Sequence, residues 1–130
     1  MIAHIKGKLV EKTPTFVVID VNGVGYHIKI SLQTFSSIKE DICKLFTHLS
    51  IKEDSHTLFG FYEKSERELF VKLISVSGVG PSTAQIILST YNSQEVIHYI
   101  TSADVNAIKS VKGIGSKTAL KVKKWYIWAF

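Results

Sequence analysis

Hydrophobic and polar residues alternate along the first half of the chain, which is the pattern of β-strands that bury one face. Residues 2–10, 16–21, 24–30, 42–51 and 57–62 form five such segments. The dipeptide Asn22-Gly23 predicts a tight hairpin between the second and third segments, and Gly7 predicts a bulge or bend in the first. In the fourth segment we expect one face to carry Leu45, Thr47, Leu49 and Ile51.

A short polar stretch, residues 31–38, follows the third segment and fits a single helical turn. Five short strands with a helical turn after the third predict an all-β N-terminal domain, a five-stranded OB-fold barrel over residues 1–62. A two-sheet sandwich is the alternative, although the segment is short for one.

The period of the apolar residues becomes helical from residue 65 onward. Ser65 and Glu68 have the spacing of a capping box at the start of the first helix. The expected helices begin near Ser65, Pro81, Asn92, Ser102 and Ser116. This pattern predicts an all-α domain over residues 63–130, with two helix–hairpin–helix units joined by a connecting helix.

A nine-residue sequence motif occurs twice, at residues 76–84 and 111–119. Each copy places an apolar residue between two glycines, followed by a hydroxyl residue and Thr-Ala at the start of a helix. Glycines allow the backbone to come close to a ligand, and the free N–H groups of a helix N-terminus bind phosphate. We expect the apolar residue to point inward and the amides of all three turn residues to face outward.

A single copy of this turn would be explained equally well as a tight connection between packed helices. Two copies with matching tails and nearby lysines favour binding of a nucleic-acid backbone without reading of its sequence. The residues expected to contact the DNA backbone are Gly78, Val79, Gly80, Ser82, Gly113, Ile114, Gly115, Lys117 and Lys121.

The charge distribution agrees with a polyanionic partner. The chain has a net charge of +5, and residues 63–130 contribute eight lysines and one arginine against five acids. No acid follows Asp104, whereas six lysines do. The chain has no apolar run of membrane-spanning length, no signal-peptide pattern at its start, and one cysteine, Cys43, which we expect in the core. A cytoplasmic protein is expected.

No catalytic constellation, cofactor motif or metal-ligand spacing is evident in the sequence, so we expect a non-catalytic protein. A helix–hairpin–helix glycosylase or lyase is one alternative, but it needs an acid beyond its hairpin, and Asp104 is the only aspartate after Asp54. A single-strand-binding barrel is the other alternative. It needs exposed aromatic residues, for which Phe35, Phe46 and Phe59 are the candidates.

The order of these motifs closely resembles the RuvA family, which recognises Holliday junctions in bacterial branch migration. The resemblance is carried by residues 52–61, 66–70, 77–81 and 113–119. It implies a homotetramer, or an octamer on DNA, that binds four-way junction DNA and holds it open and square-planar in recombination and DNA repair. It also implies RuvB, an ATP-driven motor, and the RuvC resolvase as partners.

The acidic pair Glu53-Asp54 is by itself an ordinary solvated turn. The resemblance implies that it is the family's acidic pin. Four pins would bring about eight negative charges to the strand crossover, where they repel a continuous duplex.

Two features depart from the family pattern. Ser82 stands where family members often carry a basic residue, so the first hairpin is expected to rely on backbone donors. The chain ends at Phe130, and the third helical domain that contacts RuvB is not expected in it, which leaves that contact in question.

Overall fold

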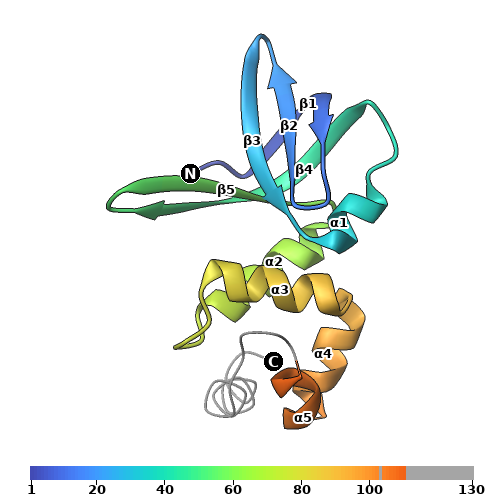
Figure 1. Cartoon of the computed structure of the whole chain (residues 1–130), viewed down its shortest axis with the longest axis vertical. Coiled ribbons are helices and arrows are strands. Elements are labelled where there is room, and N and C mark those ends of the chain that lie inside the picture. Colours follow the sequence, from blue (N-terminus) through green and yellow to red (C-terminus); the bar gives the residue numbers. More distant parts are fainter. Residues whose placement is uncertain (103, 111–130) are drawn as a thin grey trace. The chain divides into compact units, whose positions relative to one another are not determined.

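The computed structural model describes residues 1–102 and 104–110. The chain forms two compact units, the first over Met1–Arg67 and the second from Glu68 onward. Helix α2 (Lys64–Ile74) crosses the division between them (Figure 1).

The first unit is a closed five-stranded barrel. Its strands are β1 (His4–Lys12), β2 (Phe16–Val21), β3 (Val24–Ile30), β4 (Ile42–Lys52) and β5 (Ser55–Phe61), and α1 (Leu32–Ser37) follows β3. The strand order is β1-β2-β3-β5-β4, with β3 and β5 parallel and the other described pairs antiparallel. This confirms the predicted barrel and its helical turn, and the sandwich alternative is wrong.

The tight turn between β2 and β3 forms as its residues require. Asn22 and Gly23 have φ angles of 53° and 89°, which is the left-handed region that a type I′ hairpin needs. The Asp20 carboxylate accepts a hydrogen bond of 2.9 Å from the Gly23 N–H and so closes the turn.

The irregularity of β1 lies elsewhere than at Gly7. The register with β2 shifts between Leu9 and Glu11, so the bulge falls at Val10. Of the two alternatives predicted at Gly7, a bulge or a bend, the bulge is therefore wrong. A Cβ at Gly7 would instead collide with the backbone oxygen of Asp20. Gly7 is therefore required by a close approach of two strands.

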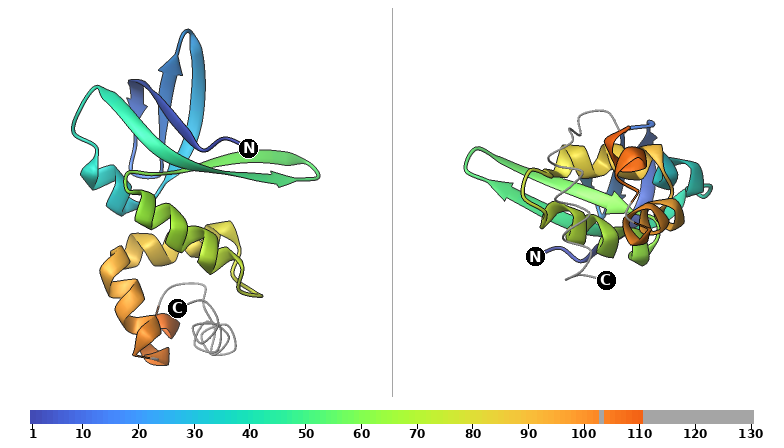
Figure 2. Two further views of the ribbon diagram at one scale, coloured as in Figure 1. Left: turned by 180° about the vertical axis from the view of Figure 1, so that it is seen from behind. Right: turned by 90° about the horizontal axis from the view of Figure 1, so that it is seen from below.

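Alternate side chains of the strands fill the barrel interior. The fully or nearly buried apolar residues of this core include Ile5, Val17, Ile19, Ile28, Ile30, Ile38, Cys43 and Leu45. The expected burial of Cys43 is confirmed. Ile51, expected on the same face as Leu45, is 63% exposed because the β4–β5 hairpin extends past the barrel wall at that point (Figures 1 and 2).

The second unit is helical, as predicted. After α2 come α3 (Pro81–Thr90), α4 (Ser93–Thr101) and α5 (Val105–Lys109). Asn92 caps α4 in a complete capping box with Glu95, which confirms the start predicted at Asn92. The helix expected from Ser116 lies outside the described residues.

Two other predicted caps are wrong. Helix α2 begins at Lys64, so Ser65 lies inside its first turn instead of capping it. Ser102 ends α4, with its backbone N–H bonded to the His98 carbonyl, and Asp104 caps α5 by accepting a 3.0 Å bond from the Ala107 N–H. Asp and Ser are both good caps, so the sequence alone did not separate them.

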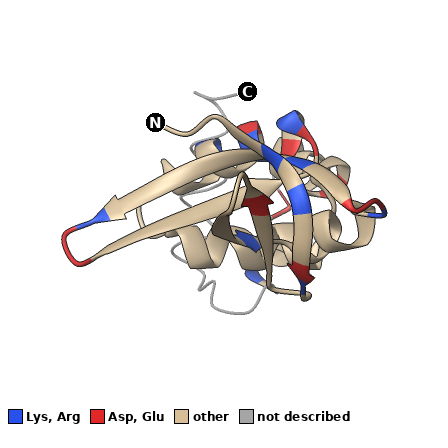
Figure 3. Ribbon diagram, turned by 90° about the horizontal axis from the view of Figure 1, so that it is seen from above, with Lys and Arg blue, Asp and Glu red and all other residues tan. Residues whose placement is uncertain are grey.

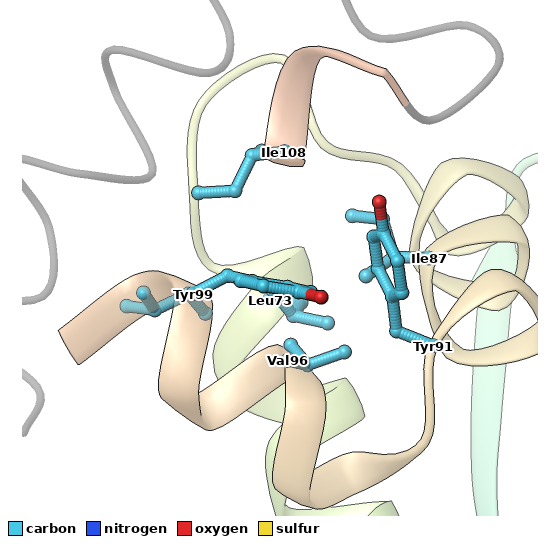
Figure 4. A pocket seen from close by; sticks show the side chains of 7 residues that line it. Leu73, Ile87, Tyr91, Val96, Tyr99 and Ile108 are labelled. Carbon is cyan, nitrogen blue, oxygen red and sulfur yellow. The ribbon is translucent and has the colours of Figure 1, made fainter. Parts of the chain in front are cut away.

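Aromatic residues close the core of the helical unit. Tyr91 and Tyr99 meet edge to face with ring centroids 4.8 Å apart, and the Tyr91 hydroxyl donates to the Ala107 carbonyl at 3.1 Å (Figure 4). The space between these rings and Leu73 has a volume of about 10 Å³, scarcely that of one water, and its lining is apolar. It is a packing gap and not a ligand site.

Candidate nucleic-acid interface

The first glycine hairpin is a tight turn between α2 and α3. The Val79 N–H donates to the Val76 carbonyl at 3.0 Å, and Gly78 has a φ of 89°. Val76 and Val79 are each 4% exposed, so the predicted inward orientation of Val79 is confirmed. Gly78 and Gly80 lie at the surface.

The turn therefore offers fewer free amides than the sequence suggested. The Val79 amide is used within the turn, so the expectation that it faces outward is wrong. The cause is the left-handed Gly78, which folds the chain back so that Val79 reaches the carbonyl three residues earlier. The open side of the turn is formed by the two glycines that flank Val79.

The start of α3 adds donors next to this turn. Gly80 is the N-cap residue with φ −87° and ψ 174°, and no side chain caps the helix. The Gly80 carbonyl accepts from the Ala84 N–H at 3.0 Å, and Pro81 has no N–H to satisfy. The amides of Ser82 and Thr83 thus stand at the positive end of a helix without an acid in its first turn. An anion placed there would be favoured.

The second hairpin lies outside the described residues. Gly113, Ile114, Gly115, Lys117 and Lys121 therefore remain predictions from the sequence. Ser82, in the first hairpin, is exposed at the start of α3 and presents a hydroxyl where the second copy has Lys117.

The acidic turn lies at the tip of the β4–β5 hairpin. Lys52 pairs with Ser55, which leaves Glu53 and Asp54 as a two-residue loop, and both are exposed (Figure 3). Among the described non-glycine residues, only Asn22 has a positive φ. The acidic loop therefore lacks the type I′ geometry that matches strand twist. Its side chains carry two negative charges away from the barrel wall.

Sequence reasoning missed a buried carboxylate beside the barrel. Glu66 has no exposed surface, and it accepts hydrogen bonds from Ser31 Oγ at 2.8 Å and Thr34 Oγ1 at 2.6 Å. Burial raises the pKa of the Glu66 carboxyl, the two hydroxyl donors oppose that rise, and the negative charge of Glu63 adds to it. No spacing in the sequence signals this, because the donors lie more than thirty residues away.

Within residues 1–102 and 104–110, no group of three or more His, Cys, Asp or Glu could hold a metal ion. Asp104, the acid that a glycosylase would need, is engaged as the cap of α5. Of the helices described here, none is both long and apolar enough to span a membrane.

Two known families match the chain. The family described as "RuvA N terminal domain" matches residues 1–60, and the one described as "SAM-like Helix-hairpin-helix tandem" matches residues 70–124. Together these matches cover the barrel and the helical hairpin region.

Curated relatives of the chain carry the name "Holliday junction branch migration complex subunit RuvA". The chain is 60% identical to the protein of Christiangramia forsetii over 94% of its own length and 64% of the relative's. It is 61% identical to the Flavobacterium psychrophilum protein over 92% and 62% of the two lengths. For Bacteroides fragilis the identity is 49%, over 94% and 61%. The chain thus spans less than two thirds of the length of these relatives.

Proposed function

The chain belongs to the RuvA family of Holliday junction branch migration subunits, and from that premise we propose that it binds four-way DNA junctions as a homotetramer. It recognises junction structure and not base sequence. It holds the junction open and square-planar, and it supports branch migration by RuvB in recombination and repair.

The observation that carries this proposal is the uncapped N-terminus of α3 beside the exposed Gly78 and Gly80. Backbone amides at a helix N-terminus contact phosphates and carry no base information. A surface of this kind suits a protein that must accept any sequence while the junction moves. The second hairpin, with Lys117 and Lys121, supplies the matching contact on the same duplex arm in this proposal.

The acidic turn gives the proposal its structural specificity. Glu53 and Asp54 project from the barrel on the β4–β5 hairpin, so a tetramer would gather several such turns near the strand crossover. Negative charge there repels the phosphates of a continuous duplex and is tolerated where the strands part.

The chain itself contributes no catalytic step in this proposal. RuvB supplies ATP hydrolysis, and RuvC acts on the same junction. The assembly is a tetramer, or an octamer when two tetramers face each other across the DNA. Light scattering with and without junction DNA distinguishes these masses.

A gel-shift titration at moderate salt tests the proposal directly. The chain should bind a four-way junction at least about tenfold more tightly than a linear duplex of equal length and composition, a difference of about 1.4 kcal/mol. Equal affinity for both DNAs would reject junction recognition. Release of a damaged base from duplex DNA would instead support a glycosylase.

Neutralising the acidic turn should relax this selectivity. The double substitution Glu53→Gln and Asp54→Asn removes both charges and keeps the side-chain size. We expect linear-duplex binding to strengthen severalfold, since repulsion is lost, while junction binding changes less. The measurement is the ratio of the two dissociation constants.

A control for this experiment neutralises acids away from the turn. Glu11→Gln with Asp41→Asn makes the same change in net charge at two exposed acids of the barrel that lie outside the acidic turn. Should the control alter the ratio as much as the turn variant does, the local repulsion is not the cause.

A further inference from the structure

Two lysines face each other across β1 and β4 on the outside of the barrel. Lys6 pairs with Lys44 in the strand register, and both are exposed. The neighbouring pairs on the same face are His4 with Phe46 and Lys8 with Ile42. Like charges directly opposite each other destabilise a sheet. An anion bound beside them would turn this repulsion into attraction.

A groove lies beside this lysine pair. Its volume is about 740 Å³, which is in the range of sites that bind small ligands or short segments. Lys6, Lys39 and Lys44 contribute to its wall, against two acids, Glu40 and Glu63. The wall is therefore net positive. All of these residues belong to the first unit.

Aromatic side chains line the same groove. Phe46 is half-buried, and its ring is engaged by two cations, the Lys44 ammonium at 5.1 Å and the Arg67 guanidinium at 5.8 Å from the ring centroid. Tyr62 is 44% exposed and lines the groove as well, and it is the ring that we expect to stack on a base. Lysines that follow a phosphate backbone, interleaved with aromatic rings for bases, are the means by which proteins hold single strands. The aromatic rings favour a nucleic acid over an acidic peptide, which needs only the charges.

We propose that this groove, the Lys6–Lys44 groove, binds the backbone of a single DNA strand. It lies on the outer β1–β4 face, whereas OB-folds commonly use the face of their second and third strands. A concave site of this size accepts one flexible strand, and a rigid duplex would span it. The proposed function supplies such strands where a junction is parted, but the groove's affinity for a single strand does not depend on junction recognition.

The test is fluorescence anisotropy with a labelled oligothymidylate of twenty nucleotides, on the full chain over a range of NaCl concentrations. Lys44→Gln should weaken binding severalfold. It should also reduce the magnitude of the slope of log K against log[NaCl] by about 0.7, the value for one lost phosphate contact on a single strand. The double variant Lys6→Gln, Lys44→Gln should reduce that magnitude by about 1.4. The melting temperature should change little, because the relieved repulsion between the strands is offset by loss of the cation–π contact of Lys44 with Phe46.

Lys8→Gln is the matched control. It removes one exposed charge from β1, on the same outer face as Lys6 and Lys44, at a position that does not line the groove. Its salt slope should remain near that of the unmodified chain. Equal losses for Lys8→Gln and Lys44→Gln would overturn the proposal, since bulk charge alone would then explain binding.

Two further outcomes would also overturn it. If the double variant keeps its affinity for the oligonucleotide but changes the assembly mass in light scattering, the face is a contact between copies. If a polyglutamate peptide displaces the oligonucleotide from the groove and binds with higher affinity, the natural occupant is an acidic protein segment. The two proposals can fail separately. If the chain shows no preference for junctions in the gel shift but Lys44→Gln still weakens oligothymidylate binding, the groove proposal stands and the proposed function is rejected.

Discussion

Replacing Glu66 with alanine is expected to lower the free energy of unfolding by about 3 kcal/mol. The carboxylate accepts from Ser31 Oγ and Thr34 Oγ1, and all three side chains are fully buried. Alanine would leave two buried hydroxyl donors without an acceptor and open a cavity between them. Chemical denaturation at neutral pH, followed by circular dichroism, measures the loss.

The effect should spread beyond the two hydroxyls. Thr34 Oγ1 also accepts from the Tyr62 N–H at 3.1 Å, and Ser31 Oγ accepts from the Thr34 N–H at 3.1 Å as the cap of α1. The buried carboxylate therefore fixes α1, the end of β5 and the first turn of α2 in one network. A loss below about 1 kcal/mol would show that the network contributes little.

Glu66→Gln is the matched control for this prediction. Glutamine fills the same volume, but Ser31 and Thr34 donate to different oxygens of the carboxylate, and in glutamine one of these oxygens is replaced by an NH2 donor. One hydroxyl therefore loses its acceptor. We expect a cost of about 1 kcal/mol, well short of that for alanine. Equal losses for the two variants would attribute the effect to the missing second acceptor and not to the cavity.

Comparison of the unmodified chain with Glu66→Gln should also reveal how the free energy of unfolding depends on pH. The raised pKa of Glu66 fixes the sign of this dependence. The folded state holds the proton more tightly than the unfolded state does. Stability from this group is therefore fully present below the unfolded pKa and is lost as pH rises through the folded pKa. The unmodified chain should lose stability relative to Glu66→Gln as pH rises through that window. A constant difference across the window would contradict the raised pKa.

The strands were predictable because their signals are local. A period of two, with turn residues between segments, places all five strands, and Asn22-Gly23 specifies its own turn through two positive φ angles. Ile51 continues the alternation of Leu45 but is exposed. Alternation specifies which side of a strand a residue occupies, whereas burial depends on whether another element covers that side.

The features that the sequence did not predict depend on residues far away in the sequence, or on a choice between two neighbouring residues that suit the same role. Glu66 has the sequence context of a helix surface, and its burial follows from hydroxyls on α1. Ser102 and Asp104 are equally good caps by residue type, and the backbone path decided between them. At the candidate site, the inward position of Val79 followed from its apolar character. The bond from its amide to Val76 depends on the left-handed Gly78, which a spacing of glycines does not specify.

Replacing Gly80 with valine should weaken junction binding by about tenfold or more, equivalent to at least about 1.4 kcal/mol, with a small effect on folding. Gly80 has φ −87° and ψ 174°, an extended conformation that valine adopts readily. A Cβ built there meets no atom within 4 Å. The free chain thus has no need of glycine at this position, beyond a helix-cap preference worth up to about 1 kcal/mol.

A phosphate bound at the first hairpin would require a residue without a side chain at Gly80. If the DNA backbone approaches the amides at the start of α3, a branched side chain at Gly80 occupies the space of the phosphate oxygens. Gly78→Val would be a poorer test, because the φ of 89° would strain any side chain and confound binding with stability.

Thr90→Val is the control for Gly80→Val. It lies at the other end of α3, keeps the side-chain shape, and removes only a hydroxyl that donates to the Ile86 carbonyl. Gel-shift titration and thermal unfolding on both variants separate binding from folding. If Gly80→Val folds and binds the junction with undiminished affinity, the first hairpin is only a connection between helices. The valine side chain would then occupy the space next to the α3 amides in the complex, so no phosphate could be bound there.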